Sequence, residues 1–149
     1  MKNQKIIPCV WFSADDGKLA NLTAYYQDLF KGDLEIGAIV SLGQTPSGYS
    51  EMCEVTLFGQ RYLFMNSAQE HHSLNDAVSL MLYCEDQAEI DLYWEYLTKD
   101  GSESQCGWCA DKYKLRWQII PRNLSQLLSK PGAWNVLMKQ KKIIMKEYE

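Results

Sequence analysis

Few of the side chains that commonly carry out chemistry occur in this sequence at a useful spacing. The only two imidazoles, His71 and His72, are adjacent in a polar stretch, and histidine is both a common metal ligand and a common general base near neutral pH. Neighbouring residues of a strand point to opposite faces, whereas in a loop their directions are free. We expect two exposed loop histidines, although His72 could fold over the mouth of a ligand cavity.

Two of the five cysteines are spaced as a C-x-x-C motif, at Cys106 and Cys109. A redox dithiol needs a helix N-terminus after the first cysteine, and a structural zinc site needs a second pair of ligands. The sequence shows neither feature. Cys9, Cys53 and Cys84 lie in apolar runs and are predicted to be small buried hydrophobic residues. An odd number of cysteines in a presumed cytosolic chain also argues against a disulfide framework.

Other arrangements that support catalysis are weak or absent from the sequence. Glu51 and Glu54 occupy one strand-like segment at an odd spacing, so they are expected to point to opposite faces and to make a poor acid–base pair. There is no G-x-S-x-G elbow, no phosphate-binding P-loop and no H-E-x-x-H pair. The residues alone therefore identify no reaction.

Length and charge restrict the possible partners. The 149 residues fit one domain, and a formal net charge of -4 argues against a nucleic-acid partner. The one basic cluster, Lys139, Lys141, Lys142 and Lys146, is expected to be a solvated helix face. There is no run of about 18 apolar residues and no signal-peptide pattern. We therefore expect a cytoplasmic protein with no membrane partner.

The first half of the sequence predicts one helix among several strands. Residues 6–12 form a short apolar run typical of a buried strand. A helix follows, capped by Asp15 or Asp16 and stopped by Gly32. Residues 33–42 suggest a strand and 43–50 a loop. Strands over 52–58 and 61–66 then flank Gly59-Gln60, which predicts a hairpin with a type II′ turn.

The same order of elements then recurs about seventy residues further along. A strand over 77–84 precedes a helix capped by Asp86, with Glu89 placed to complete a capping box and Gly101 to end the helix. Strands over 102–109 and 113–120 and short helices over 124–128 and 133–142 follow. Helices that are segregated onto sheets of mixed or antiparallel strands indicate an α+β fold. A ferredoxin-like sandwich fits this order almost as well, but the additional hairpin favours a repeated βαβββ unit.

Several segments resemble one family, in order along nearly the whole chain. They include Ile7-Pro8-Cys9-Val10-Trp11-Phe12, Gln105-Cys106-Gly107-Trp108 and Trp117-Gln118-Ile119-Ile120-Pro121. The chain is similar to PhnB-like proteins of the glyoxalase / bleomycin resistance / dioxygenase group, the vicinal oxygen chelate superfamily. The resemblance implies a single domain over 1–149, with module one at about 5–67, module two at about 77–121 and a C-terminal helical tail at about 122–149.

The resemblance further implies that the two βαβββ modules form a curved mixed sheet around a cavity, commonly completed by homodimerisation. Some relatives carry a name that implies a demethylubiquinone methyltransferase. A typical methyl-donor site uses a Gly-rich strand–turn–helix nest on a larger parallel sheet, and this sequence has no such nest.

Metal-dependent members of the superfamily hold one divalent ion on His, Gln or Glu side chains from both modules, with open positions for substrate oxygens. The corresponding positions here are Pro8, Val10, Asn66, Ala77, Ser79 and Gln118. Amides without an anchoring imidazole or carboxylate are poor ligands. We therefore predict no complete metal site and no cofactor. Gln118 is either a hydrogen-bonding residue of the pocket or a structural partner for a neighbouring strand.

An aromatic cavity with a few amides suits a small organic ligand. The candidate ligand-binding residues are Trp11, Phe64, Asn66, His72, Ser79, Trp108 and Gln118. Because side chains alternate along a strand, Trp117 packs under the helices if Gln118 faces the cavity. We expect a dimeric protein that binds a small molecule without metal. The alternatives are a metal-dependent lyase or dioxygenase-like enzyme that uses Gln118 and His72, and an interaction module whose aromatic surface serves the dimer.

Overall fold

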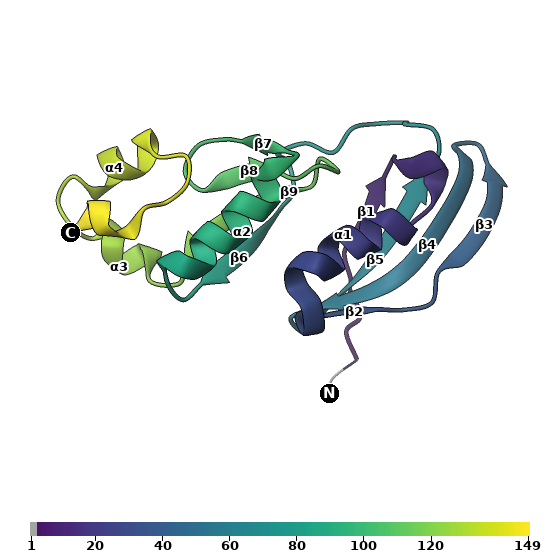
Figure 1. The fold of residues 1–149 in the computed structure, drawn as a ribbon, viewed down its shortest axis with the longest axis horizontal. Helices are drawn as coiled ribbons and strands as arrows, with labels where there is room; N and C mark the ends of the chain where they lie inside the picture. Colours follow the sequence, from purple (N-terminus) through teal and green to yellow (C-terminus); the bar gives the residue numbers. More distant parts are fainter. Residues whose placement is uncertain (1–2) are drawn as a thin grey trace. The chain divides into compact units, whose positions relative to one another are not determined.

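The computed structural model describes residues 3–149, which divide into two compact units (Figure 1). The chain passes from the first unit to the second between Ser73 and Leu74. Each unit is built on one mixed sheet that carries a helix on one face. No helix within the described residues has both the length and the apolar character needed to cross a bilayer.

The first unit consists of a five-stranded sheet with one α-helix on one face. Its elements are β1 (Cys9–Phe12), α1 (Ala20–Phe30), β2 (Leu34–Ile36), β3 (Val40–Thr45), β4 (Gly48–Leu57) and β5 (Gln60–Ser67), with 3₁₀ turns at Asp15–Gly17 and Lys31–Asp33. The strand order is β1-β5-β4-β2, with β3 also paired to β4. β2 pairs with one end of β4 and β3 with the other, so together they act as one interrupted strand. β1 is parallel to β5, and the remaining pairs are antiparallel.

The second unit repeats this topology. Its elements are β6 (Ser79–Cys84), α2 (Gln87–Lys99), β7 (Ser102–Glu103), β8 (Trp108–Ala110), β9 (Arg116–Pro121), α3 (Leu124–Leu128), α4 (Ala133–Lys139) and a 3₁₀ turn at Met145–Tyr148. The sheet order is β6-β9-β8-β7, with β6 parallel to β9. Both units thus have the βαβββ order, which confirms the predicted α+β class and its repeated module.

Each helix is held to its sheet by the apolar positions that helical periodicity predicts. On α1 the buried side chains include Leu22, Tyr26 and Leu29, and on α2 they include Ile90 and Trp94. These residues recur at intervals of three and four and therefore share one face of the helix. At about 25 cal/mol per Å² of apolar surface, burying each such side chain contributes roughly 1.5–3 kcal/mol.

The N-terminus of α2 is capped by the residues that the sequence predicts. The backbone nitrogen of Glu89 donates to Asp86 Oδ1 over 2.9 Å, and the Glu89 carboxylate accepts from the backbone nitrogen of Glu85 over 2.8 Å. The predicted capping box is therefore present, although Glu89 reaches one residue beyond the N-cap.

The start and end of α1 differ from the prediction. Asp15 and Asp16 lie in the 3₁₀ turn and do not cap α1, whose N-cap position is Leu19. At the other end, Lys31 rather than Gly32 adopts the positive φ angle, 50°. The prediction was wrong because residue type favours Gly in the left-handed region, whereas the tertiary structure places the turn one residue earlier.

The hairpin between β4 and β5 has a different turn from the one predicted. β4 ends at Leu57 and β5 begins at Gln60, so the two connecting residues are Phe58 and Gly59. Their φ angles are 49° and 80°, both positive, which is the pattern of a type I′ turn rather than a type II′ turn. The hairpin itself is confirmed, and its register is shifted by one residue from the expected one.

Several strand boundaries also differ, and the strands expected over 33–42, 77–84 and 113–120 are found at Leu34–Ile36 with Val40–Thr45, at Ser79–Cys84 and at Arg116–Pro121. The first strand begins at Cys9, and Ile6 is exposed. The segment 43–50 is part of a β3–β4 hairpin rather than a loop. The strand expected over 102–109 is divided into β7 and β8 by a turn in which Cys106 and Gly107 both have positive φ. A continuous polar and Gly-containing run does not reveal where such a turn interrupts the pairing.

The C-terminal tail forms a small core of its own on the second unit. Ile120 of β9 is buried with Leu127, Leu137, Ile143 and other tail residues. Gln87 of α2 accepts from the backbone nitrogen of Met145 and donates to the Ile143 carbonyl, over 2.8 and 3.0 Å. The tail is therefore fastened to both the sheet and the helix of this unit.

Candidate functional site

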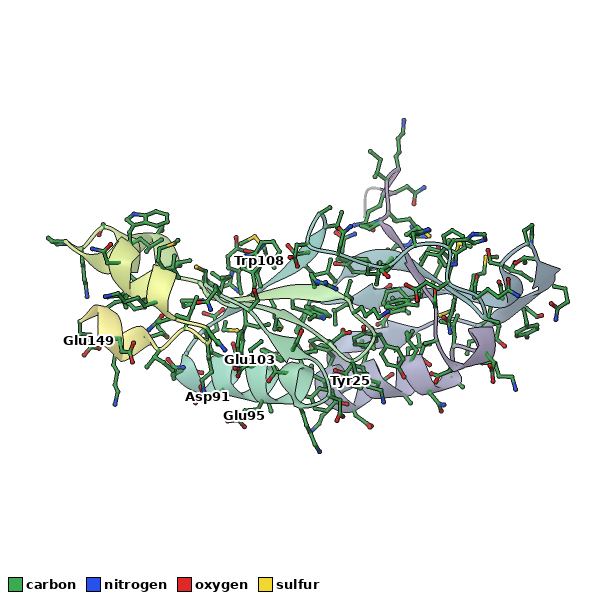
Figure 2. The ribbon with its side chains drawn as sticks, turned by 90° about the horizontal axis from the view of Figure 1, so that it is seen from above. Tyr25, Asp91, Glu95, Glu103, Trp108 and Glu149 are labelled. Carbon is green, nitrogen blue, oxygen red and sulfur yellow. The ribbon has the colours of Figure 1, made fainter. Side chains whose placement is uncertain are left out.

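The sheet of the second unit has one face covered by α2 and one face that α2 leaves free. Trp117 lies on the covered face, where it is 2% exposed and its indole nitrogen donates to Asp111 Oδ2 over 2.9 Å. Alternation along β9 places Gln118 on the opposite face. Figure 2 shows Trp108 on that side of the sheet, with Asp91 and Glu95 of α2 on the other side. We call this surface the free face of the second sheet.

Three strands contribute a continuous row of side chains across the free face. Gln118 pairs with Met81 of β6 on one side and with Trp108 of β8 on the other. The Gln118 Nε2 atom donates to Ser79 Oγ over 2.8 Å. Met81 is 49% exposed and Trp108 is half-buried. The Gln118 amide thus lies between an accessible thioether and an accessible indole, and Ser79 lies beside it on β6.

The charges on this face are neutralised within the unit. Arg116, two residues from Gln118 on the same strand, donates through Nε to Asp76 over 2.9 Å and through Nη1 to the backbone carbonyls of Leu74 and Lys114. Arg122 lies 5.7 Å from the centroid of the Tyr83 ring and is paired with Glu85. Neither guanidinium is left as an isolated positive charge.

The tail limits the free face at one end. Ile120 follows Gln118 on the same side of β9 and is buried at 4% exposure by the tail cluster. The accessible part of the face is therefore centred on Ser79, Met81, Trp108 and Gln118. Met81 was not among the predicted site residues, although alternation from Ser79 would have indicated it.

The first unit also has a sheet face that its helix does not cover. Phe12 packs against Tyr26 of α1, so its neighbour Trp11 points to the other side. The Trp11 indole nitrogen donates to Ser67 Oγ over 2.9 Å. Both histidines lie against the Trp11 ring, with centroid separations of 5.6 Å for His71 and 4.8 Å for His72. Both loop histidines are thus exposed to solvent, while their rings contact the Trp11 ring.

A shallow cavity of about 200 Å³ opens on the same side of this sheet, lined among others by Val40, Met52 and Leu63. The Glu54 carboxylate also borders it and is paired with Arg61 over 2.6 Å. The walls are mainly apolar, and their one acidic side chain is already neutralised.

Phe64 and Asn66 lie on the face that α1 covers, which differs from their expected orientation towards a cavity. Phe64 is 6% exposed and its ring centroid lies 5.1 Å from that of Phe12. Asn66 is fully buried, and its Nδ2 atom donates to the carbonyls of Ala14 and Lys18 over 2.9 and 2.7 Å. Their orientation depends on which face of β5 packs against α1, and the sequence alone does not reveal that face. Ligand contact by any of the seven candidates stays a prediction.

The geometry of the C-x-x-C pair is that of structural thiols. Cys109 lies on the covered face at 2% exposure, and burial, followed by the nearby charges of Asp111 and Glu103, raises its thiol pKa to about 12. Cys106 occupies the turn before β8, where its Sγ contacts the Leu137 carbonyl oxygen at 3.5 Å. The nucleophile in thiol chemistry is the thiolate, and Cys109 does not supply one near neutral pH.

The side chains do not fit a divalent metal ion of the kind that the superfamily binds. Within residues 3–149 there is no group of three or more His, Cys, Asp or Glu side chains placed to hold one. Gln118 and Ser79 offer neutral oxygens, which without an imidazole or carboxylate hold such an ion weakly, and the cationic Arg116 lies on the same strand. His72 belongs to the first unit and Gln118 to the second, so neither unit brings these two predicted ligands together by itself.

The strand-to-helix junctions are already occupied by carboxylates of the chain. At α1, Glu51 Oε2 accepts from the backbone nitrogen of Leu19 over 2.8 Å, and at α2 the first turn is capped by Asp86 and Glu89. A helix N-terminus binds phosphate through such N–H groups. Neither junction has the Gly-rich nest that dinucleotide and methyl-donor sites use.

These features define a protein of the glyoxalase/bleomycin resistance fold, and comparisons with known proteins agree. Residues 4–120 match the family described as 3-demethylubiquinone-9 3-methyltransferase, so the chain belongs to this PhnB-like family. None of the curated proteins matches the sequence. The match ends before the tail.

Three solved structures illustrate the likeness. A putative 3-demethylubiquinone-9 3-methyltransferase, PhnB protein, from Bacillus cereus is 26% identical, with a TM-score of 0.66 over 79% of this chain and 99% of that one. A Pseudomonas aeruginosa protein is 17% identical (TM-score 0.59; 80% and 98% covered). The fosfomycin resistance protein FosX from Listeria monocytogenes is 14% identical (TM-score 0.56; 87% and 100% covered). The last two likenesses establish the fold alone.

Proposed function

We propose that this protein binds a small organic molecule on the free face of its second sheet and does so without a resident metal ion. The observation that carries the proposal is the row Met81–Gln118–Trp108, in which a side-chain amide lies between two accessible apolar groups. Ligand sites are mostly apolar with a small number of placed polar groups that fix orientation. The row, together with the Gln118–Ser79 bond, has this composition.

The proposal includes a cytoplasmic homodimer, as the resemblance to PhnB-like proteins implies, and no nucleic-acid partner. Trp11 and His72 of the first unit stay predicted ligand-binding residues of that unit, where they lie together on the sheet face that α1 does not cover. Methyl transfer, which the names of the family and of the Bacillus cereus relative imply, is not part of the proposal. The carboxylate-capped helix termini support leaving it out.

Ligand-observed NMR with a library of small aromatic and aliphatic compounds tests the proposal. Compounds that bind the wild-type protein are compared on Met81→Lys, which places a charge at one end of the row, at a position already half exposed. Burying an unpaired charge beside an apolar ligand is costly, so binding is expected to fall by at least about tenfold while the melting temperature changes little.

The matched control is Leu92→Lys, which makes a similar change at an exposed position of α2, 56% exposed. Leu92→Lys should leave binding unchanged. The proposal fails if no compound binds, or if both variants bind every compound as well as the wild type.

Metal content by mass spectrometry and melts with added Mn, Ni, Zn and Fe(II) test the metal-dependent alternative. About one metal ion per chain, with a raised melting temperature, would favour that alternative.

A further inference from the structure

On the basis of the function proposed above, we infer that the ligand is uncharged and presents a carboxamide, or an equivalent neighbouring acceptor and donor, to Ser79 and Gln118. The inference concerns the chemical class of the ligand. It depends on which hydrogen-bonding groups of the free face remain available and on which charges are already paired.

The Ser79–Gln118 pair keeps unused hydrogen-bond donors and an unused acceptor close together. Ser79 Oγ accepts from Gln118 Nε2 over 2.8 Å, so the hydroxyl hydrogen of Ser79 is directed elsewhere. Across residues 3–149 that hydroxyl and the second N–H of Gln118 Nε2 have no acceptor, and Gln118 Oε1 has no donor. A carboxamide carries a carbonyl that accepts from Ser79 and an N–H that donates to Gln118. A carboxylate carries acceptors only, so it could accept from Ser79 and from Gln118 Nε2 but would leave Gln118 Oε1 without a donor.

The charged side chains near Gln118 also favour an uncharged ligand. An anionic ligand is usually held by a guanidinium that can form two parallel bonds to it. Arg116, which is closest in sequence to Gln118, already donates to Asp76 and to two backbone carbonyls. Arg122 is paired with Glu85. An anion on this face would therefore lose hydration without gaining a free cation, and that desolvation is unfavourable.

The neighbours of the polar pair favour a flat apolar body attached to the carboxamide. Met81 and Trp108 lie on the two strands that flank Gln118, and both are accessible. A methionine thioether adapts to irregular shapes and contacts aromatic rings favourably, and an indole stacks on planar groups. A neutral aromatic carboxamide satisfies the polar pair and both flanking residues.

Four small probes that share one ring test the inference. They are benzamide, benzoate, phenylphosphonate and toluene, titrated separately into the ¹⁵N-labelled full-length chain at neutral pH. The signals to follow are the side-chain amide of Gln118, assigned with Gln118→Leu, and the indole N–H of Trp108, assigned with Trp108→Phe. We expect benzamide to shift both signals and to bind at least about tenfold more tightly than benzoate or phenylphosphonate.

Two variants distinguish the loss of the Ser79 hydrogen-bond donor from a general effect on folding. Ser79→Ala removes the free hydroxyl and should weaken benzamide about fivefold to tenfold while leaving toluene unchanged. Ser102→Ala, on the exposed strand β7, is the matched control and should change neither probe. Equal weakening of benzamide and toluene by Ser79→Ala would mean a structural role for Ser79 and would overturn the inference.

The remaining outcomes distinguish this inference from the function on which it rests. Tighter binding of benzoate or phenylphosphonate at the same two signals would overturn the uncharged class and leave a ligand site. Equal binding of benzamide and toluene would overturn the role of the Ser79–Gln118 pair and leave an apolar site. If none of the four probes, and no compound of the wider library, shifts either signal, the proposed function itself fails.

Discussion

The side-chain amide of Asn66 donates to the carbonyl oxygen of Lys18 over 2.7 Å, which ties the end of β5 to the turn that precedes α1. Asn66 also exchanges two bonds with the backbone of Ala14, each of 2.9 Å, and is fully buried. One side chain thus satisfies three backbone groups of a segment that has no ladder of its own. Asn66 holds the helix in place on its sheet.

Replacing Asn66 with leucine is expected to destabilise the protein by about 3 kcal/mol. The change keeps the branched shape but leaves partly buried backbone groups of Ala14 and Lys18 without partners, and each such group costs roughly 1–3 kcal/mol. Urea denaturation followed by circular dichroism measures the loss. Asn75→Leu, at an exposed loop residue that makes one local bond, is the control and should stay within about 0.5 kcal/mol of wild type. Similar values for the two variants would contradict this role.

Glu51 provides a second long-range contact to the same segment. Its Oε2 atom accepts from the backbone nitrogen of Leu19, and its Oε1 atom from the Tyr49 hydroxyl, over 2.8 and 2.9 Å. The first turn of α1 contains no acidic residue, and its N-cap Leu19 cannot accept a hydrogen bond through its side chain. Glu51 therefore replaces the missing cap and also complements the positive end of the helix.

We expect Glu51→Leu to lower the free energy of unfolding by about 1–2 kcal/mol, the usual contribution of a cap. Glu54→Leu makes the same change on the opposite face of β4, where the carboxylate forms an exposed pair with Arg61. Such pairs contribute little, so this variant should lose at most about 0.5 kcal/mol. Thermal and urea melts of the two variants measure the difference. An effect of Glu54→Leu as large as that of Glu51→Leu would show that the Leu19 bond is unimportant.

The features that the sequence predicts well are those set by local geometry. The buried positions of α1 and α2 follow from helical periodicity, and the opposite orientation of Trp117 and Gln118 follows from alternation along a strand. The caps of α1 could not be predicted in this way, because Glu51 is separated from Leu19 by 32 positions. The orientation of Phe64 depends on which side of the sheet receives α1, and periodicity within β5 carries no such information.

The end of α1 offers a direct test of local preference against tertiary structure. Lys31 has φ 50° and ψ -125°, a region favoured by glycine, whereas Gly32 has no positive φ and has open space around its Cα. Lys31→Gly should therefore stabilise the protein by about 1 kcal/mol through relief of backbone strain. Gly32→Ala should stabilise it by roughly 0.5 kcal/mol, because it restricts the unfolded chain. Urea melts of both variants provide the measurement, and a loss of stability in Lys31→Gly would place the strain elsewhere.

Thiol reactivity tests the placement of the five cysteines. Cys53, Cys84 and Cys109 are each at most 2% exposed, and burial, with smaller contributions from nearby carboxylates, raises their thiol pKa values to about 11, 12 and 12. At pH 8 a disulfide reagent such as dithionitrobenzoate should therefore modify at most Cys9 and Cys106 in the folded protein. The other three should react only after denaturation in guanidinium. Rapid labelling of Cys109 in the native state, shown by peptide mapping, would contradict its buried position and reopen a dithiol role.

The same raised pKa values predict a loss of stability at alkaline pH. In the unfolded chain a thiol ionises near its ordinary pKa of about 8.5, whereas in the folded protein these three remain protonated to about pH 11–12. Above pH 8.5 the folded state thus binds more protons than the unfolded state, so unfolding becomes easier as the pH rises. The contribution should be fully present at pH 7, and it should decline between about pH 9 and pH 12. Urea melts across this range, compared with Cys84→Ala and Cys109→Ala, measure it, because each variant should flatten the alkaline slope of stability against pH.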